Sequence, residues 1–574
     1  MMRYLLPLAV FLGAGAFYYV QACPTFYYWD SAELTAAILG GGVPHPPGFP
    51  LFLLLAGGWG YIAPLGRVFS LNMLSVFFAA LGLALWCLVT RLVLKYIHVI
   101  QSEIVVSLLS LATAVLIGIS LTYGIQATRL EVYALNFAGF GGLMLLALGI
   151  SQRRGKSGLE VLWFFALLGL MLGVHILTIA LTIPGILTLL IARKKLDLKL
   201  SIMGITLSLL LAAGLYSTLI FRAEAHPLLN WGDPSNLQRF IDYVFVREFS
   251  VSTSRLSAEH FGELIGFAFG LLAKQLGVAG LVMSFLGLAF ITARERAIGI
   301  SLLVILVLNI LSVALAENYF YENYDLHGYL TISLGILALS FAAGALLLYE
   351  LVAKRIWEGH TKVGAAVLAF AVTVGLMVFP ISGNLGQANL SNVRGAEDYA
   401  GRFLAGAPRD AIVLTSSYNT YFCALAYRKA YRNSNDQIIL NVYNWDHPWG
   451  REQSKRLLGI PLPNSRWRQE FYKNLVNHVL RRRPLYIEYD ESSGPLAEHL
   501  WPQGLGYVLD TEIANDSIAG DDSIIARAMK ANDIESIRTW GLWLHNRGQY
   551  YKRRGAVAEA LKYDSAFENL ASKY

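Results

Sequence analysis

Long apolar segments separated by short polar ones fill the first two thirds of the chain. A membrane-spanning helix needs about 20 such residues, because its backbone polar groups must pair within the segment. Eleven candidate spans lie near residues 3–21, 70–97, 103–122, 134–152, 160–176, 177–192, 200–221, 274–293, 298–316, 328–350 and 363–381. Residues 49–66, around Pro64, favour a partial or interfacial helix. The pattern predicts a mainly α-helical, polytopic bundle in a lipid bilayer.

The pattern changes after residue 382, where short apolar runs alternate with amphipathic ones. Strands are predicted at 410–417, 436–444 and 484–490, and helices at 394–406, 418–430 and 466–480. This alternation is typical of a small α/β domain with a mainly parallel sheet. The segment contains no glycine-rich phosphate loop, which argues against a nucleotide site.

The end of the chain has the spacing of one tetratricopeptide-like helical hairpin. Its spaced residues are Trp540, Leu544, Gly548, Tyr551, Ala556, Ala560 and Tyr563. Such solenoids need about three repeats to be stable alone, so we expect this single unit to cap the α/β domain. The predicted domains are therefore a transmembrane domain at 1–381, an α/β domain at 382–530 and a hairpin at 531–574.

Charge follows the same division. Residues 1–381 hold 22 Lys+Arg and 18 Asp+Glu, whereas the 193 residues of 382–574 hold 24 and 21. Soluble domains average about 25% charged residues, so the first part is strongly depleted. A soluble enzyme and a disordered scaffold are excluded. The three cysteines are too few and too scattered for a zinc site or a disulfide framework.

The cations also give an orientation. With the N-terminus cytoplasmic, 14 Lys and Arg residues fall in loops on the inner side of alternate spans, as the positive-inside rule requires. The basic excess is thus a topology signal, and no nucleic-acid partner is needed. We expect an uncleaved first helix, a bacterial inner (cytoplasmic) membrane, and residues 382–574 on the periplasmic side.

The same topology places unusual polar residues together on the outer side. Asp30 and Glu33 are three apart, so they share one face of a helical turn. An N-cap with a first-turn acid would explain that pair equally well. The other outer residues are His45, Arg129, Glu131, Tyr133, His175, Arg222, His226, Asn230, Trp231, Asp233, Asp325, His327 and Tyr329. Ionisable groups near membrane depth are costly and usually functional.

An outward-facing membrane enzyme has no ready supply of nucleotide-activated donors, so a sugar on a lipid phosphate is the natural alternative. A carboxylate would take the proton of an attacking hydroxyl, and direct attack would invert the anomeric centre. Asp30 or Glu33 would be that base. Cationic or imidazole groups would bind the phosphate by charge-assisted hydrogen bonds, and the candidates are Arg129, Arg222, His45 and His175.

Several motifs resemble those of the protein O-mannosyltransferase-like family of GT-C membrane glycosyltransferases. They are Asp30-Ser-Ala-Glu33-Leu with Gly-Val-Pro44-His45-Pro-Pro-Gly48, Arg129-Leu-Glu131-Val-Tyr133-Ala-Leu-Asn136, Gly173-Val-His175-Ile-Leu, Asn230-Trp231-Gly232-Asp233-Pro234 and, more weakly, Asp325-Leu-His327-Gly-Tyr329. The resemblance implies a GT-C fold, a polyprenyl-phosphate sugar donor, most often a mannose carrier, and a hydroxyl acceptor.

The resemblance also assigns roles to residues. It maps the first-loop catalytic acids onto Asp30 and Glu33 and the second-loop acid onto Glu131. Many GT-C enzymes have adjacent acids in the first loop, so the choice between Asp30 and Glu33 stays open. The expected substrate-binding residues are His45, Arg129, Tyr133, His175, Arg222, Asn230, Trp231, Asp233, Asp325 and His327.

We predict no metal and no cofactor, because the resemblance to mannosyltransferases does not require one. The acceptor, a protein Ser/Thr or a glycan, is left open by the sequence. The alternative function is a multi-span transporter with an outward-facing path of acids and histidines. Transporters usually place such residues at the midplane of paired repeats, and this sequence shows no internal repeat.

Overall fold

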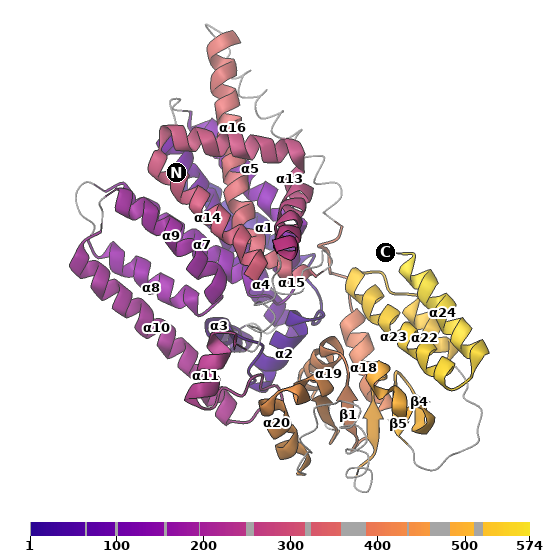
Figure 1. Ribbon diagram of the computed structural model, residues 1–574. Coiled ribbons are helices and arrows are strands. Elements are labelled where there is room, and N and C mark those ends of the chain that lie inside the picture. The colour runs from indigo at the N-terminus through magenta and orange to yellow at the C-terminus, as the bar shows by residue number, and fades with distance from the viewer. Residues whose placement is uncertain are drawn as a thin grey trace. The chain divides into compact units, whose positions relative to one another are not determined.

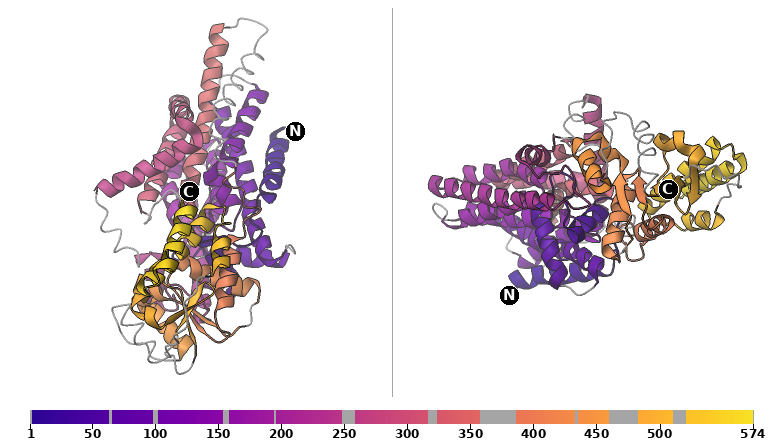
Figure 2. Two further views of the ribbon diagram at one scale, coloured as in Figure 1. Left: turned by 90° about the vertical axis from the view of Figure 1, so that its right-hand side faces the viewer. Right: turned by 90° about the horizontal axis from the view of Figure 1, so that it is seen from below.

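The computed structural model describes residues 2–62, 66–97, 102–153, 158–193, 196–247, 258–315, 323–356, 386–432, 435–459, 483–509 and 521–573. The chain forms two compact units. Unit 1 contains residues 1–23, 46–221 and 241–392. Unit 2 contains residues 24–45, 222–240 and 393–574, so three separate stretches of sequence fold together in it. Figures 1 and 2 show the elements of each unit from three directions.

Unit 1 is built from helices throughout its described residues. They are α1 (Met2–Tyr19), α3 (Pro50–Ile62), α4 (Arg67–Ile97), α5 (Glu103–Gly118), α6 (Leu121–Ala127), α7 (Tyr133–Ser151), α8 (Glu160–Leu172), α9 (Ile176–Ala192), α10 (Leu198–Glu224), α11 (Leu237–Val244), α13 (Ala258–Arg294), α14 (Arg296–Leu315), α15 (Tyr324–His327), η2 (Gly328–Leu330) and α16 (Thr331–Ile356). The last residues of α10 and the first of α11 belong to unit 2.

Six of the described helices are long and apolar enough to cross a membrane, or seven if the bent pair α5 and α6 is counted as one span. The chain is a multi-pass membrane protein. Ten of the eleven predicted spans coincide with described helices, four of them in the shorter helices α1, α5, α8 and α9, and 49–66 contains the short helix α3. The segment 363–381 lies outside the described residues, so the count of eleven stays a prediction.

Small residues allow the central helices of unit 1 to approach closely. Helix α16, which runs through the bundle in Figure 1, packs along α13. A Cβ at Gly287 of α13 would lie 1.7 Å from the Ser340 carbonyl oxygen of α16, and one at Gly344 would lie 2.4 Å from the Met283 carbonyl oxygen. Only glycine fits at these contacts, as is usual where membrane helices touch backbone to backbone.

A sharp bend positions the second polar loop of unit 1. Helices α5 and α6 meet at an angle of 72°. Ser120 caps α6, since its hydroxyl accepts a hydrogen bond from the Tyr123 amide at 3.2 Å. Helix α6 ends at Ala127, and the Thr128 carbonyl then accepts a bond of 2.7 Å from the Cys23 amide. The loop that follows, 128–132, carries Arg129 and Glu131.

Unit 2 contains a five-stranded sheet of order β2-β1-β3-β5-β4. The strands are β1 (Ile412–Thr415), β2 (Ile438–Asn441), β3 (Leu485–Ile487), β4 (Leu500–Gln503) and β5 (Gly506–Leu509). Strands β2, β1 and β3 are parallel, with Leu414 opposite both Leu440 and Ile487. Strands β5 and β4 continue the sheet in antiparallel pairing. The parallel part was predicted from the sequence, whereas the β4–β5 hairpin was not.

The helices of unit 2 come from both ends of the chain. They are α2 (Asp30–Gly40), α18 (Gly395–Gly406), α19 (Tyr418–Ala430), η3 (Val442–Asp446), α20 (Pro448–Leu458), η4 (Glu491–His499), α22 (Asp522–Ala528), α23 (Ile534–Arg553) and α24 (Val557–Ala571). Helix α2 packs against α19, and α18 also packs on α19. The predicted helix at 466–480 lies outside the described residues.

The terminal hairpin lies against the antiparallel edge of the sheet, an arrangement compatible with the predicted cap. Helix α23 pairs with α24 and bonds to the β4–β5 hairpin through side chains. Trp543 Nε1 donates to the Leu505 carbonyl at 2.8 Å, Arg547 Nη2 donates to the Gly504 carbonyl at 2.7 Å, and the Tyr550 hydroxyl donates to the Leu500 carbonyl at 2.6 Å.

Candidate active site

In unit 2, the first-loop acids and His45 form one cluster. Glu33 lies on the first turn of α2 with its side chain fully buried, and its two oxygens contact the His45 amide at 2.8 Å and the His45 Nδ1 at 2.5 Å. Asp30 begins the same helix, and its Oδ1 lies 4.0 Å from His45 Nδ1. The Asp30 and His45 side chains are 27% and 26% exposed. The two acids thus have different surroundings: Glu33 is enclosed and Asp30 is accessible.

The residue before Asp30 is held in an unusual conformation. Trp29 has φ 53° and ψ −127°, a region that non-glycine residues rarely occupy. Its amide donates to Asn419 Oδ1 at 3.1 Å, and its indole Nε1 donates to Glu535 Oε2 at 2.7 Å. The nearby Tyr28 hydroxyl lies 3.1 Å from the Ser536 hydroxyl. The C-terminal part of the chain therefore fixes the backbone from which α2 and Asp30 start.

The 222–234 loop supports the other end of this segment. The Val43 amide donates to the Leu229 carbonyl at 2.9 Å, and the Trp231 amide donates to the Val43 carbonyl at 3.1 Å. Arg222 Nη1 donates to the Gly42 carbonyl at 3.2 Å. These bonds fix the turn that leads to His45. Arg222, a predicted phosphate ligand, contacts this backbone.

The predicted residues Asn230, Trp231 and Asp233 pack within unit 2. Asn230 Nδ2 donates to Asp233 Oδ1 at 2.8 Å, and the other Asp233 oxygen receives Arg239 at 2.9 Å and lies 3.5 Å from Arg456. The Trp231 ring lies against Tyr418, Phe422 and Trp449, with the Tyr418 centroid 4.9 Å away. These three side chains thus make packing and polar contacts within unit 2. Their role in substrate binding stays a prediction.

In unit 1, a buried arginine joins the two other predicted acids. Arg129 Nη2 lies 2.6 Å from Asp325 Oδ1 and 3.5 Å from Glu131 Oε1, with the Arg129 side chain only 1% exposed. The Glu131 amide donates to the Ser75 hydroxyl at 3.0 Å. One cation and two carboxylates leave a net negative charge here. The expected contact of Arg129 with a donor phosphate is not tested by this geometry.

His175 stands at the start of α9 inside an aromatic enclosure. Its Nδ1 accepts from the Thr178 amide at 3.4 Å, which caps the helix and assigns the ring proton to Nε2. Tyr329, Tyr133 and Phe49 surround the ring at centroid distances of 5.0, 5.2 and 5.9 Å. The structure thus brings together two predicted residues, Tyr133 and His175, with Tyr329. His327 is fully buried and packs edge-on against Tyr324.

Some contributors were missed from the sequence. Phe49, Trp29, Asn419 and Glu535 each contact or position a predicted site residue. Phe49 follows the quoted Pro-Pro-Gly48 motif and has φ 50°, which a sequence does not reveal. Trp29 precedes Asp30 directly, and this position beside the motif was the one sign in the sequence that Trp29 belongs to the site. Asn419 and Glu535 lie 390 and 506 residues from Trp29.

The cluster of Asp30, Glu33 and His45 contains a carboxylate that could act as a base, and its residue types are also those of metal ligands. One ligand atom from each of Asp30, Glu33 and His45 lies within 4.8 Å of the others. Both Glu33 oxygens, however, are already engaged by His45. The Asp30 carboxylate, partly accessible on the first turn of α2, is well placed to accept a proton from a hydroxyl.

Comparison with known proteins finds a match over the segment that contains this cluster. Residues 30–199 match the model of the Protein O-mannosyl-transferase TMEM260 N-terminal domain. The Mus musculus Protein O-mannosyl-transferase TMEM260 is 29% identical over 251 residues, which are 42% of this chain. The match spans 34% of the mouse protein, so about a third of that relative's length is represented here.

Solved structures show the fold. ArnT from Cupriavidus metallidurans bound to undecaprenyl phosphate superposes with a TM-score of 0.56 at 11% identity, covering 89% of this chain and 99% of ArnT. The same protein in the apo state gives a TM-score of 0.54 at 11% identity, covering 90% and 99%. The predicted fold class, a polytopic helical bundle of GT-C type, is confirmed, and the sheet of unit 2 is compatible with the predicted C-terminal α/β domain.

Proposed function

Since this chain is a relative of the protein O-mannosyl-transferases and has a GT-C fold, we propose that it is an inverting membrane glycosyltransferase. It transfers a sugar, mannose, from a polyprenyl-phosphate carrier to a hydroxyl group on the outer face of the cytoplasmic membrane. The name of the mouse relative supports mannose and a protein hydroxyl as acceptor. The lipid bound to ArnT supports a polyprenyl-phosphate donor.

The observation that carries this proposal is the contrast between Asp30 and Glu33. Asp30 is 27% exposed at the start of α2, whereas Glu33 is buried and both its oxygens contact His45. Asp30 is therefore the base that receives the acceptor proton. Glu33 positions His45 and the loop. This assignment chooses between the two acids that the sequence left open.

The reaction is a single displacement. The acceptor oxygen forms a bond to the anomeric carbon while its proton passes to the Asp30 carboxylate. The bond from the anomeric carbon to the phosphate oxygen breaks, and the polyprenyl phosphate leaves with that electron pair. The sugar configuration inverts because no covalent glycosyl-enzyme forms.

The polar residues of unit 1 complete the proposal on the donor side. His175 has its ring proton on Nε2 and can donate it to a phosphate oxygen. Tyr133 and Tyr329 flank that ring. Arg129 holds Glu131 and Asp325 in place by its contacts with both. Glu131 then supports the base or binds the acceptor.

Transfer of radiolabelled mannose from mannosyl-phospho-polyprenol tests the function directly. Membranes with the wild-type chain should label a protein or glycan fraction. Asp30→Asn should lower the rate by a factor of about 10² to 10⁴, the usual contribution of a general base. Asp446→Asn, a change at an exposed residue of unit 2, is the matched control and should leave the rate unchanged. Full transfer by Asp30→Asn would refute the assignment of Asp30 as the base, and full transfer by Glu33→Gln as well would refute the mechanism as a whole.

The proposed outer location of unit 2 needs engineered cysteines, because Cys423 is buried and would not report accessibility. In a chain lacking the native cysteines, Asn532→Cys lies at an exposed position of unit 2, and Gln152→Cys at an exposed position after α7. An impermeant thiol reagent added to intact spheroplasts should label Asn532→Cys. Gln152→Cys should react only after lysis. The reverse pattern would overturn the orientation.

A further inference from the structure

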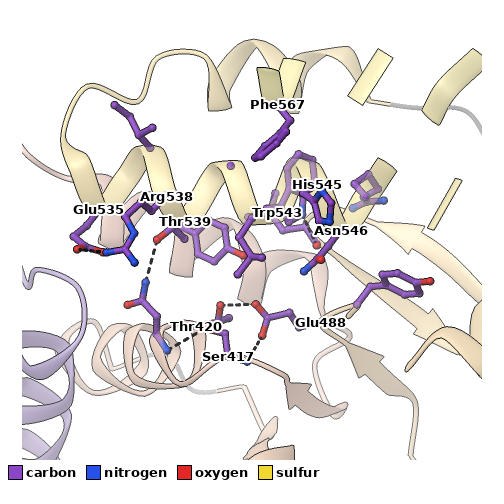
Figure 3. Close-up of a pocket in the computed structure, with 18 of the residues that line it drawn as sticks. Ser417, Thr420, Glu488, Glu535, Arg538, Thr539, Trp543, His545, Asn546 and Phe567 are labelled. Carbon is purple, nitrogen blue, oxygen red and sulfur yellow. Dashed lines mark hydrogen bonds and ion pairs between the residues drawn. The ribbon is translucent and has the colours of Figure 1, made fainter. Parts of the chain in front are cut away.

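Unit 2 contains a cavity of about 750 Å³ whose lining does not include Asp30, Glu33 or His45. Figure 3 shows helix α23 on one side of it, with Arg538, Thr539, Trp543 and Asn546, and Ser417, Thr420 and Glu488 on the other. Cavities of about 300–1,000 Å³ are typical of small-molecule sites. Trp29 also lines the cavity, so the residue next to Asp30 forms part of its wall.

The cavity lies where open α/β sheets bind ligands. Strand β1 has β2 on one side and β3 on the other, so the chain connections diverge from it. Ligands bind at the carboxyl ends of the strands at such a point. Ser417 follows the end of β1 and Glu488 follows the end of β3, and both residues line the cavity.

Glu488 is a buried polar residue in the wall of this cavity. It is buried, and its Oε2 accepts hydrogen bonds from the Ser416 and Ser417 amides at 2.8 and 3.0 Å. The Thr420 hydroxyl lies 2.5 Å from its Oε1. Burial raises the pKa of Glu488 to about 7, so this carboxyl carries little charge in mildly acidic solution.

The other charged groups around the cavity have partners. Glu535 lies 3.2 Å from Arg538 and also receives the Trp29 indole. Arg547 lies over the rings of Tyr507 and Trp543, with its guanidinium carbon 4.4 and 5.0 Å from their centroids. The cavity therefore suits an uncharged polar ligand better than an ion.

The walls combine flat aromatic rings with hydrogen-bonding groups. Trp29, Trp543, Tyr489, Tyr507 and Phe567 supply the rings. Among the described residues, the buried hydroxyls of Tyr489 and Tyr507 have no hydrogen-bond partner. Buried polar groups normally find one, in the protein, in water or in a ligand.

We infer that this cavity binds a neutral saccharide unit. The aliphatic C–H faces of a sugar ring pack on aromatic side chains, and its hydroxyls both donate and accept hydrogen bonds, so they can pair with the Tyr489 and Tyr507 hydroxyls. The further step, that the sugar belongs to a glycan-bearing acceptor, rests on the proposed function. Trp29 would then connect acceptor binding with the segment that carries Asp30.

Saturation-transfer NMR on the full chain in nanodiscs tests the inference. The probes are methyl α-D-mannopyranoside, methyl β-D-glucopyranoside and N,N′-diacetylchitobiose. We expect saturation of the ring protons of at least one probe. Gly541→Leu should abolish the signal, because a Cβ at Gly541 meets only the Phe567 ring, at 3.7 and 3.8 Å, and a larger side chain enters the cavity.

Two further substitutions on α23 provide a second test and a matched control. Asn546→Ala removes a cavity-lining amide and should weaken binding at least fivefold. Gln549→Ala, three residues along α23 and outside the lining, should bind as wild type. Binding unchanged in Gly541→Leu, or no saturation of any probe, would overturn the inference. Asp30→Asn should still bind the probe, so a failure of the proposed reaction does not affect this result.

Discussion

The indole of Trp29 donates a 2.7 Å hydrogen bond to Glu535, a residue 506 positions further along the chain. This bond, with that from the Trp29 amide to Asn419, holds the residue before Asp30 at a positive φ. Such a conformation persists only where surrounding contacts enforce it. The position of the proposed base thus depends on the first turn of α23.

Glu535→Ala should lower the turnover number although Glu535 is not part of the cluster of Asp30, Glu33 and His45. Loss of the Trp29 contact lets the start of α2 shift, and a misplacement of about 1 Å costs roughly 10- to 100-fold in rate. Glu535→Gln keeps a carbonyl oxygen for the indole and should restore most activity. Glu568→Ala, an exposed acid on α24, is the matched control. Equal losses in the alanine and glutamine variants would argue against a positioning role.

Arg129→Leu should destabilise the protein strongly. The side chain is buried between Glu131 and Asp325, and removing one partner of a buried ionic group typically costs about 3–5 kcal/mol. Arg153→Leu removes a half-exposed arginine that pairs with Glu160, and such pairs contribute about 0–1 kcal/mol. Thermal unfolding of both variants in detergent measures the difference. Equal melting temperatures would contradict the structural role of Arg129.

His175 serves as a helix cap and as the proposed phosphate donor, and two substitutions separate these roles. His175→Asn retains a capping side chain, whereas His175→Ala does not. Both should weaken binding of the lipid-linked donor by roughly tenfold or more, the value of one lost hydrogen bond to a charged group. Acceptor binding should change less. Normal donor affinity in His175→Asn would leave the ring with a structural role alone.

Glu488 makes the stability of unit 2 depend on pH. Its pKa is raised from 4.5 to about 7 by burial, so the folded chain holds a proton that the unfolded chain releases at lower pH. This group's contribution is fully present below pH 4.5 and is lost as the pH rises through about 7. The loss is on the order of 3 kcal/mol. Glu488→Gln should abolish that dependence, so its melting temperature should exceed that of wild type at pH 8. A parallel decline in both proteins would assign the titration to another group.

Chelation should leave the reaction unchanged. Asp30, Glu33 and His45 have the spacing of metal ligands, but both Glu33 oxygens contact His45. A metal would have to displace those contacts. Transfer measured with and without excess EDTA checks this, and loss of activity restored by one divalent cation would contradict it.

The sequence predicted what depends on local pattern. Hydropathy located the helices, the alternation of apolar runs located β1, β2 and β3, and Asp30, Glu33 and His45, which the structure brings into one cluster, were named as candidates from their motif. It did not predict that residues 24–45 and 222–240 fold with the C-terminal region. Nor did it find Asn419 and Glu535 beside Trp29. Those contacts join residues hundreds of positions apart, and no helical or strand period records them.

The discontinuous composition of unit 2 has a consequence for biosynthesis. Asp30 emerges early, whereas the α23 residue that anchors its neighbour is 506 positions later. At roughly 5–20 residues per second, the ribosome needs roughly 25 to 100 s to reach that partner. Throughout this interval the nascent chain lacks the α23 residue that holds Trp29. A chain terminated before α23 would lack Glu535, so under the proposed mechanism it would lack the contact that fixes Trp29 beside the base.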